Sequence, residues 1–263
     1  MMDRQGFFCI RIRITQYFLH YLLFLMYSKN VTMKTLFTAI ILSACSIMVQ
    51  AQCENAYFPM KDGVTFEQTS YNAKDKKEGK VISTISATTN TQLVVQNKIY
   101  DKKDELITEG DYEVFCEDGK VKMDFEQFIP DELLSSYQNM EVNIEGDFLE
   151  FPNNLSVGQN LPDANGTITI VMAEGAMNMK TTITLTFTNR KVELQESITT
   201  PAGTFETFKV SQTTISAMEI MGMSRETTFS SASWIAEGVG AVRSENYDKK
   251  GKLAGYQVLT SFE

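Results

Sequence analysis

The sequence is poor in histidine. Its single histidine, His20, lies in an N-terminal stretch that we expect to be absent from the folded body. Without an imidazole, this body cannot form a Ser-His-Asp arrangement, a histidine general base that titrates near neutral pH, or a zinc site of the usual histidine type. We therefore exclude enzymes of these kinds.

Other catalytic motifs are missing as well. The chain has no Cys-x-x-Cys pair, no glycine-rich phosphate loop and no dinucleotide-binding fingerprint. Carboxylate pairs could still support chemistry of the glycosidase type, but carboxylates are so abundant in this chain that their presence is weak evidence. We expect a non-catalytic protein without a cofactor, and a carboxylate-based hydrolase is the alternative.

Positive charge is scarce. The chain has 24 Lys and Arg against 33 Asp and Glu, which gives a net charge of -9. Residues 1–51 hold five of the basic residues and one Asp, so residues 52–263 alone carry a net charge of -13. Such a surface repels nucleic-acid phosphates and anionic lipid headgroups, and no basic stripe interrupts it. We exclude nucleic acid as a partner.

Long apolar runs are confined to the N-terminus. Residues 33–51 have the pattern of a secretory signal peptide: a basic residue precedes the apolar run Leu36–Val49, and Ala51 suits cleavage by a signal peptidase. This processing predicts a periplasmic or secreted protein. The segment Leu42-Ser43-Ala44-Cys45 also resembles a bacterial lipobox, so the alternative is a lipoprotein whose only membrane attachment is a lipid on Cys45.

Residues 1–32 precede this signal. Their apolar segment, Phe18–Tyr27, is shorter than the roughly 20 residues that a membrane-spanning helix needs. We expect residues 1–32 to be a mis-assigned start or a disordered extension, and an uncleaved N-terminal anchor is the alternative. No linker rich in Pro, Gly or Ser divides the rest, so residues 52–263 are expected to form a single β-rich envelope domain.

Only two cysteines, Cys53 and Cys116, remain after residue 51. In an oxidising envelope compartment two remaining cysteines are more often paired than free. We expect a disulfide between them, with two unpaired thiols as the alternative.

Short runs of β-branched and aromatic residues, separated by turns, dominate residues 52–263. In the clearest example, Lys191–Gln212, two alternating segments flank Pro201-Ala202-Gly203, which predicts a hairpin. A separate threonine-rich strand, Met179–Thr188, is expected just before it. Only Pro130–Tyr137 has a helical pattern, with Pro at the first position and acidic residues in the first turn. The sequence predicts an all-β, mainly antiparallel fold: one curved sheet with one short helix at residues 130–137.

Three expected strands end in the same way. Tyr71-Asn72, Tyr100-Asp101 and Tyr247-Asp248 are each followed by charged residues rich in lysine. An Asn or Asp side chain can bond to the backbone two residues further on, and lysines keep an exposed tip soluble. We interpret these segments as repeated hairpin turns rather than as a repeated binding site.

Three stretches carry a resemblance to a known family. They are Leu149–Pro152 continuing through Leu161-Pro162-Asp163, Asn189–Val192 continuing through Thr200–Phe205, and Trp234–Tyr247 with its Gly-Val-Gly. They resemble an uncharacterised family of Gram-negative envelope proteins of the TapB-like kind. The resemblance implies a fold similar to the LolA/LolB lipoprotein carriers, a strongly curved antiparallel half-barrel with a helix over its mouth. It brings no established activity and no catalytic residues.

Methionines and aromatic residues are the best candidates for a ligand surface. Methionines gather in two regions, and flexible thioether side chains suit an adaptable apolar lining as well as a core. The candidate lining residues are Met172, Met177, Met179, Phe187, Phe208, Met218, Met221, Met223, Phe229 and Trp234. We expect a periplasmic binding or carrier module that holds an apolar ligand, such as an acyl chain or a hydrophobic segment of a partner protein, on the concave face of the sheet.

Two other functions stay open. The first is an envelope structural or protein-interaction domain with no small ligand, which would work through a sheet edge or an exposed patch. The second is a Cu(I) site, because thioethers are soft ligands suited to that ion. Its ligands would be Met177, Met179, Met221 and Met223.

Overall fold

The computed structural model describes residues 55–89, 91–123, 141–174 and 177–263. These ranges all belong to the compact unit Gln52–Glu263. Within them the chain forms thirteen β-strands in one antiparallel sheet, and no helix there is long and apolar enough to cross a membrane. The strands are β1 (Thr65–Asn72), β2 (Lys77–Ala87), β3 (Gln92–Asp101), β4 (Leu106–Glu117), β5 (Lys120–Met123), β6 (Glu141–Gly146), β7 (Leu149–Pro152), β8 (Ala164–Glu174), β9 (Met177–Thr200), β10 (Gly203–Ile220), β11 (Met223–Ala236), β12 (Gly240–Tyr247) and β13 (Leu253–Phe262).

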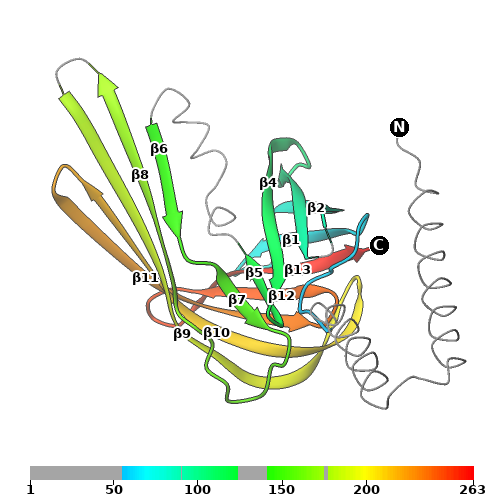
Figure 1. Ribbon diagram of the computed structural model, residues 1–263. Helices are drawn as coiled ribbons and strands as arrows, with labels where there is room; N and C mark the ends of the chain where they lie inside the picture. The colour runs from blue at the N-terminus through cyan, green and yellow to red at the C-terminus, as the bar shows by residue number, and fades with distance from the viewer. Residues whose placement is uncertain (1–54, 90, 124–140, 175–176) are drawn as a thin grey trace, which may run out of the picture. The chain divides into compact units, whose positions relative to one another are not determined.

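The order of the strands requires the sheet to curl. The order is β6-β8-β9-β10-β11-β12-β13-β1-β2-β3-β4-β5-β7, so β6 and β7 form its two edges. Yet β6 ends at Gly146 and β7 begins at Leu149, and three residues of extended chain span at most about 11 Å. The two edges therefore approach each other where the chain passes between them, and the sheet bends round a concave face (Figure 1). The predicted all-β architecture with one curved antiparallel sheet is confirmed.

The first and last strands meet in the middle of the sheet. Strand β13 pairs with β1 from Phe66 opposite Phe262 to Asn72 opposite Gly255. At the end of this pair, the backbone amides and carbonyls of Glu263 and of Thr65, the first residue of β1, bond to each other in both directions. The β1–β13 pair thus joins the half of the sheet that contains β2–β5 and β7 to the half that contains β6 and β8–β12.

Three long hairpins build the second half. Strands β8, β9 and β10 span 11, 24 and 18 residues, and the predicted turn at Pro201-Ala202 joins β9 to β10. The predicted separation of Met179–Thr188 from the following strand is wrong, because β9 runs through it without a break. Asn189 has a φ of 52°, and the register against β10 shifts nearby between Ser211 and Thr213. The irregularity bends the strand without ending it.

Three clusters of buried apolar residues line this sheet. The largest draws on β1–β5 and β11–β13 and includes Val95, Val114 and Val242, which are fully buried. A second cluster lies between β7, β8 and β9, and a third combines Tyr57 with residues of β9, β10 and β11. Trp234 of the largest cluster and Ile235 of the third are neighbours on β11. Successive residues of a strand point to opposite faces, so these two clusters lie on opposite sides of β11.

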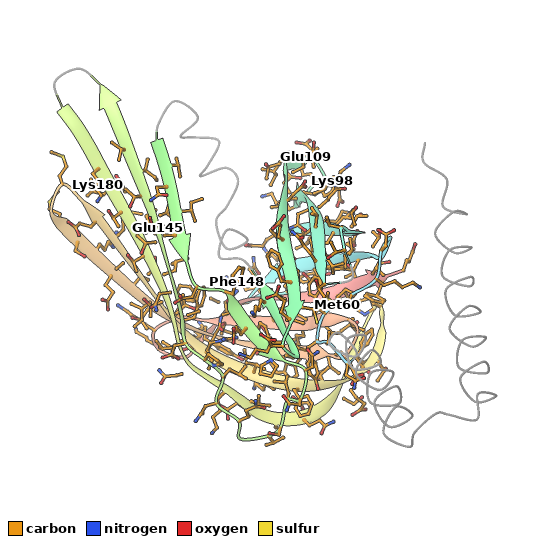
Figure 2. The ribbon with its side chains drawn as sticks, viewed as in Figure 1. Met60, Lys98, Glu109, Glu145, Phe148 and Lys180 are labelled. Atoms are coloured by element: carbon orange, nitrogen blue, oxygen red, sulfur yellow. The ribbon has the colours of Figure 1, made fainter. Side chains whose placement is uncertain are left out.

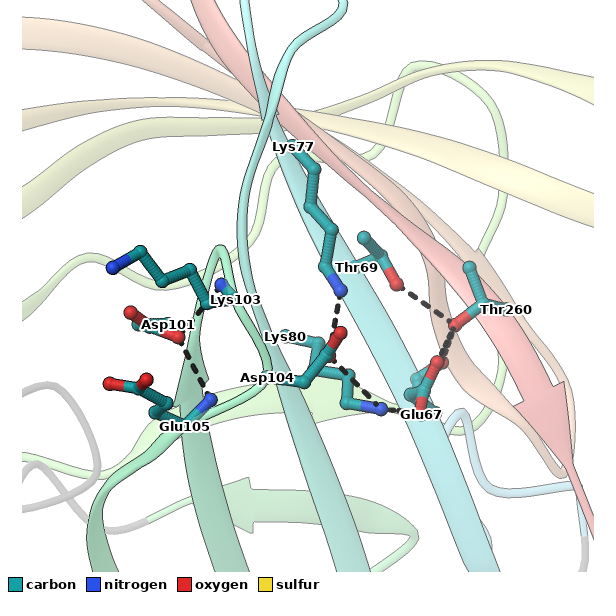
Figure 3. Close-up of polar contacts among 9 residues, drawn as sticks. All are labelled: Glu67, Thr69, Lys77, Lys80, Asp101, Lys103, Asp104, Glu105 and Thr260. Carbon is teal, nitrogen blue, oxygen red and sulfur yellow. Dashed lines mark hydrogen bonds and ion pairs between the residues drawn. The ribbon is translucent and has the colours of Figure 1, made fainter.

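The charged residues form networks at the hairpin tips and on the strand surfaces (Figure 3). The backbone amide of Lys103 donates to a carboxylate oxygen of Asp101, and Lys74 and Lys250 make the same contact with Asn72 and Asp248. These three bonds confirm the turn chemistry predicted for the Tyr-Asn and Tyr-Asp segments.

Glu67 on β1 is the centre of a second polar network in Figure 3. Burial alone would raise the pKa of its carboxyl, but hydrogen bonds from Lys80 and Thr260 hold this pKa below its usual value. Lys80 also forms an ion pair with Asp104 across a distance of 3.4 Å. The network links β1, β2 and β13 with the β3–β4 turn.

Two expectations fall partly outside the described residues. The predicted helix at residues 130–137 lies in the range 124–140, which the structure does not describe. Cys116 is buried on β4, but Cys53 precedes the first described residue. The disulfide between them therefore stays a prediction.

Candidate functional site

A small apolar pocket lies between strands from the two halves of the sheet. Figure 2 draws the described side chains over the whole sheet. Its volume is about 190 Å³, below the range of roughly 300–1,000 Å³ that is typical of sites for drug-sized ligands. The lining residues are Tyr57, Met123, Leu149, Phe151, Val210, Gln212, Ser233, Ile235 and Ala241. Apart from Tyr57, which precedes β1, they come from β5 and β7 at one end of the sheet and from β10, β11 and β12 in its other half. Only a curled sheet can bring these strands to one pocket, which fixes its position inside the curve.

The strand period explains why these residues share the pocket. Leu149 and Phe151 are two residues apart on β7, as are Val210 and Gln212 on β10, and Ser233 and Ile235 on β11. Residues at positions i and i+2 point to the same face of a strand. The register places Val210 opposite Ser233 and Met123 opposite Leu149, so the walls are built from cross-strand pairs.

Besides Tyr57, two residues with polar side chains, Ser233 and Gln212, line this pocket. The hydroxyl of Ser233 lies 3.0 Å from that of Ser244 on β12. The half-buried side chain of Gln212 makes no hydrogen bond with any described residue. An amide can donate two hydrogen bonds and accept two, so Gln212 can bind the polar end of a ligand whose apolar part enters the pocket.

An apolar stripe continues from the pocket along the long hairpins. We define the stripe as Val142, Ile144, Ile168, Ile170, Ile183 and Phe187, all on β6, β8 and β9. Ile168 lies opposite both Ile144 and Ile183, so the three side chains share one face. The same cluster includes Leu149 and contacts Phe151, two residues of the pocket wall. Pocket and stripe thus form one continuous apolar surface.

The opposite face of these hairpins is polar. Thr167 lies opposite Thr184, and Thr169 lies opposite Thr182, at positions that alternate with the stripe residues. Their side chains are half-buried rather than buried. The hairpins therefore present an apolar face to the concave side and a threonine-rich face to the other, a pattern typical of a half-buried antiparallel sheet.

A buried arginine holds one wall of the pocket in place. The side chain of Arg190 on β9 is 1% exposed. It donates from Nη1 to the carbonyl oxygen of Pro162 at 2.6 Å and from Nη2 to that of Glu150 at 3.0 Å. The guanidinium carbon lies 4.9 Å from the ring centre of Phe151. Burial lowers the pKa of Arg190 to about 10, against the opposing effect of the carboxylates of Asp163 and Glu150.

The contacts of Arg190 connect β9 to β7 and to the loop after β7, although β7 and β9 are not paired in the sheet. This residue was not among the candidates from the sequence. Nothing in the local sequence separates it from its exposed neighbour Lys191, because only the folded chain brings two carbonyl groups to its side chain.

Trp234 lies between two pocket-lining residues of β11 but contacts other groups. Its indole N–H donates to the carboxylate of Glu196, and the ammonium of Lys209 lies 4.7 Å from the ring centre. The guanidinium of Arg243 lies 5.9 Å away. The side chain is 6% exposed and belongs to the largest apolar cluster. Trp234 is thus packed with residues of the fold.

The other sequence candidates are spread over the second half of the sheet. Phe187 is buried in the stripe, and Phe208 packs edge-on against Tyr57 with ring centres 5.9 Å apart. Phe229 is half-buried and lies opposite Thr214. Met218 is 40% exposed. Of the candidates whose side chains the structure describes, none lines the pocket.

The two groups of methionines both lie near hairpin tips. The backbone of Met172 pairs with that of Met179, and Met177 begins β9, but the side chains of these three residues are not described. Met221 and Met223 are 66% and 73% exposed. In the described ranges, no cluster of three or more His, Cys, Asp and Glu residues could hold a metal ion. A Cu(I) site made of methionine sulfurs stays a prediction.

The comparison with solved structures supports this fold. A protein described as a candidate lipoprotein from Parabacteroides distasonis matches with a TM-score of 0.61 and 22% identity, over 79% of this chain and 98% of that one. A candidate exported protein with a YmcC-like fold from Bacteroides fragilis matches with a TM-score of 0.60 and 21% identity, over 78% and 98% of the two chains. At this identity the similarity shows the fold alone.

The remaining comparisons concern families and curated proteins. A search of curated proteins found no match. The family described as DUF3108-like matches residues 61–259, which include nearly all of the sheet. By this match, the chain belongs to the DUF3108-like family.

Proposed function

We propose that this protein is a non-catalytic binding or carrier module of the cell envelope, with an apolar ligand on the concave face of its sheet. The ligand class is an acyl chain or a comparable apolar segment that carries one polar group. One observation carries the proposal: the pocket between β5, β7 and β10–β12 is apolar, contains the amide of Gln212, which bonds to no described residue, and continues into the apolar stripe. The pocket volume of about 190 Å³ suits the end of an alkyl chain.

The envelope location rests on the N-terminal signal and on the similar structures. Residues 33–51 have the pattern of a secretory signal, and two structures with this fold are described as a candidate lipoprotein and a candidate exported protein. We propose cleavage after Ala51, with lipid attachment at Cys45 as the alternative. The resemblance to TapB-like proteins and to the LolA/LolB carriers belongs to the same proposal, because a curved sheet with an apolar concave face is the architecture that such a carrier needs.

A first test fills the pocket. Ala241 lines the pocket, and Ala241→Leu adds three carbon atoms to it, whereas Ala254→Leu adds them at an exposed position on β13. A fluorescent fatty acid titrated into the mature chain should bind the wild type and Ala254→Leu equally. It should bind Ala241→Leu at least about tenfold more weakly, a difference of about 1.4 kcal/mol. Equal binding by all three proteins would remove the pocket from the proposal.

A second test identifies what the protein carries. Native mass spectrometry of the protein purified gently from its own host should show an adduct that is lost on denaturation. A clean mass without an adduct would contradict the carrier function and favour a structural or protein-interaction domain. The same spectrum would distinguish a chain that begins at Gln52 from one that begins at an acylated Cys45.

A further inference from the structure

The turn between β10 and β11 has an unusual residue at its tip. Strand β10 ends at Ile220 and β11 begins at Met223, so Met221 and Gly222 form a two-residue turn. Both have positive φ angles, 49° and 79°, which defines a type I′ turn. Gly favours this turn because it has no Cβ atom to be crowded, and Asn and Asp tolerate it because their short polar side chains can form local hydrogen bonds.

Met221 is an exception among the described residues. The other non-glycine residues with positive φ are Asn55, Asp75, Asp104, Asp118 and Asn189. Asp118 provides a direct comparison, because Asp118 and Gly119 form the same kind of turn between β4 and β5, with φ angles of 53° and 70°. The chain therefore uses the favoured Asp-Gly pair at one hairpin and a strained Met-Gly pair at the other.

The strained methionine is also the centre of an exposed apolar tip. Met218, Met221 and Met223 are 40%, 66% and 73% exposed, so Met221 and Met223 are among the most exposed large apolar side chains described. The run from Ile220 to Ser224 has no charge, and the first charged residues on either side are Glu219 and Arg225. Figure 1 shows this hairpin reaching to the far end of the sheet. An exposed apolar side chain at this position destabilises the fold in two ways. The turn holds its backbone in a strained conformation, and its apolar atoms are in contact with water.

We infer that the β10–β11 tip inserts into the apolar layer of a lipid bilayer. Methionine side chains are flexible and apolar, and they adapt to a disordered surface. The net charge of -13 on residues 52–263 opposes binding to anionic lipids, so the partner surface is one of zwitterionic lipids. The contact is apolar and therefore insensitive to salt.

The register links the tip to the apolar stripe. Ile220 lies opposite both Met223 and Thr181, and Thr181 lies opposite Ile170 of the stripe. Opposite residues share a face, so Ile220 and Met223 continue the stripe toward the tip. The inserted tip thus stands at one end of the apolar surface whose other end is the pocket. Insertion itself does not require a ligand in the pocket.

The experiment measures binding of the mature chain to phosphatidylcholine vesicles by co-sedimentation, at low and at high salt. The decisive variant is Met221→Asn, which restores the favoured Asn-Gly turn. It should partition at least about tenfold more weakly than the wild type, while its thermal unfolding temperature stays equal or rises. A loss of binding in this variant cannot come from misfolding, because Asn suits the conformation better than Met.

Two control variants show whether vesicle binding depends on the tip itself. Val157 is a 57% exposed apolar residue in another loop, and Val157→Ser should leave vesicle binding unchanged. Ala241→Leu, which fills the pocket, should also bind vesicles normally, so failure of the carrier proposal would not affect this test. Absence of wild-type binding, or equal binding by Met221→Asn, would overturn the inference.

Discussion

Replacing Arg190 by methionine removes the buried guanidinium but keeps most of the side-chain volume. The variant loses two hydrogen bonds from a charged donor to the carbonyl groups of Pro162 and Glu150. Bonds of this kind contribute about 1.5–3 kcal/mol each, so the loss is roughly 3–6 kcal/mol. The variant also escapes the cost of burying a charge. Burial lowers the pKa of Arg190 from 12.5 to about 10, which corresponds to about 3 kcal/mol.

The difference of these effects, at the middle of the range, predicts that Arg190→Met lowers the free energy of unfolding by about 1.5 kcal/mol. Arg190→Ala should lower it by roughly 4 kcal/mol, because it also leaves a cavity beside Phe151. Lys249→Met, at an exposed position on the tip after β12, is the matched control and should have no effect.

Urea unfolding followed by the fluorescence of Trp234, the only tryptophan, measures these changes as shifts of the midpoint at constant slope. If Arg190→Met proved as stable as the wild type, the hydrogen bonds from Arg190 to Pro162 and Glu150 would contribute no net stability. If Arg190→Met and Arg190→Ala were equally stable, the cavity argument would fail.

Three further substitutions test other parts of the fold. Glu67→Gln should reduce the loss of stability in acid. The carboxyl of Glu67 has a pKa below its ordinary value of 4.5, so its charged form stabilises the fold above pH 4.5, and this stabilisation is lost as the pH falls through the lower pKa of the folded state. Equal urea midpoints of both proteins across that pH range would contradict this. Gly79→Ala should cost about 1–3 kcal/mol, since its Cβ would lie 2.5 Å from the carbonyl oxygen of Tyr100; an unchanged denaturation midpoint would refute the close approach. Cys53→Ser should cost about 3–4 kcal/mol if Cys53 is bonded to Cys116, and two reactive thiols in the denatured wild type under non-reducing conditions would show that the bond does not exist.

The sequence predicted the elements whose cause is local. Asn72, Asp101 and Asp248 were expected to bond to the backbone two residues on, and all three do so, because this bond depends on a side chain and a turn within a few residues. The turn at Pro201-Ala202 was predictable for the same reason. The predicted end of a strand at Thr188 was wrong. A bulge at Asn189 lets the strand continue although the alternation of apolar and polar residues shifts there.

The candidate site could not be predicted in the same way. Its walls combine Phe151 of β7 with Val210 and Ile235 of the paired strands β10 and β11. Only the curl of the whole sheet brings β7 to these two strands. Period-two pairs on single strands were visible in the sequence, but no local feature shows which face becomes concave. The strain at Met221 was also hidden, because Met carries no preference for a left-handed turn, and only the two-residue connection imposes it.

The pairing of β1 with β13 determines when this chain can fold. Until residues 253–262 are available, β1 lacks its partner on one side and the two halves of the sheet have no common strand between them. Pairing between strands that are distant in sequence forms slowly, and the complete sheet can form only after the last strand has been synthesised. A nonsense mutation that removes only β13 would therefore split the sheet at its centre, and its effect would be far larger than the loss of one strand from an edge.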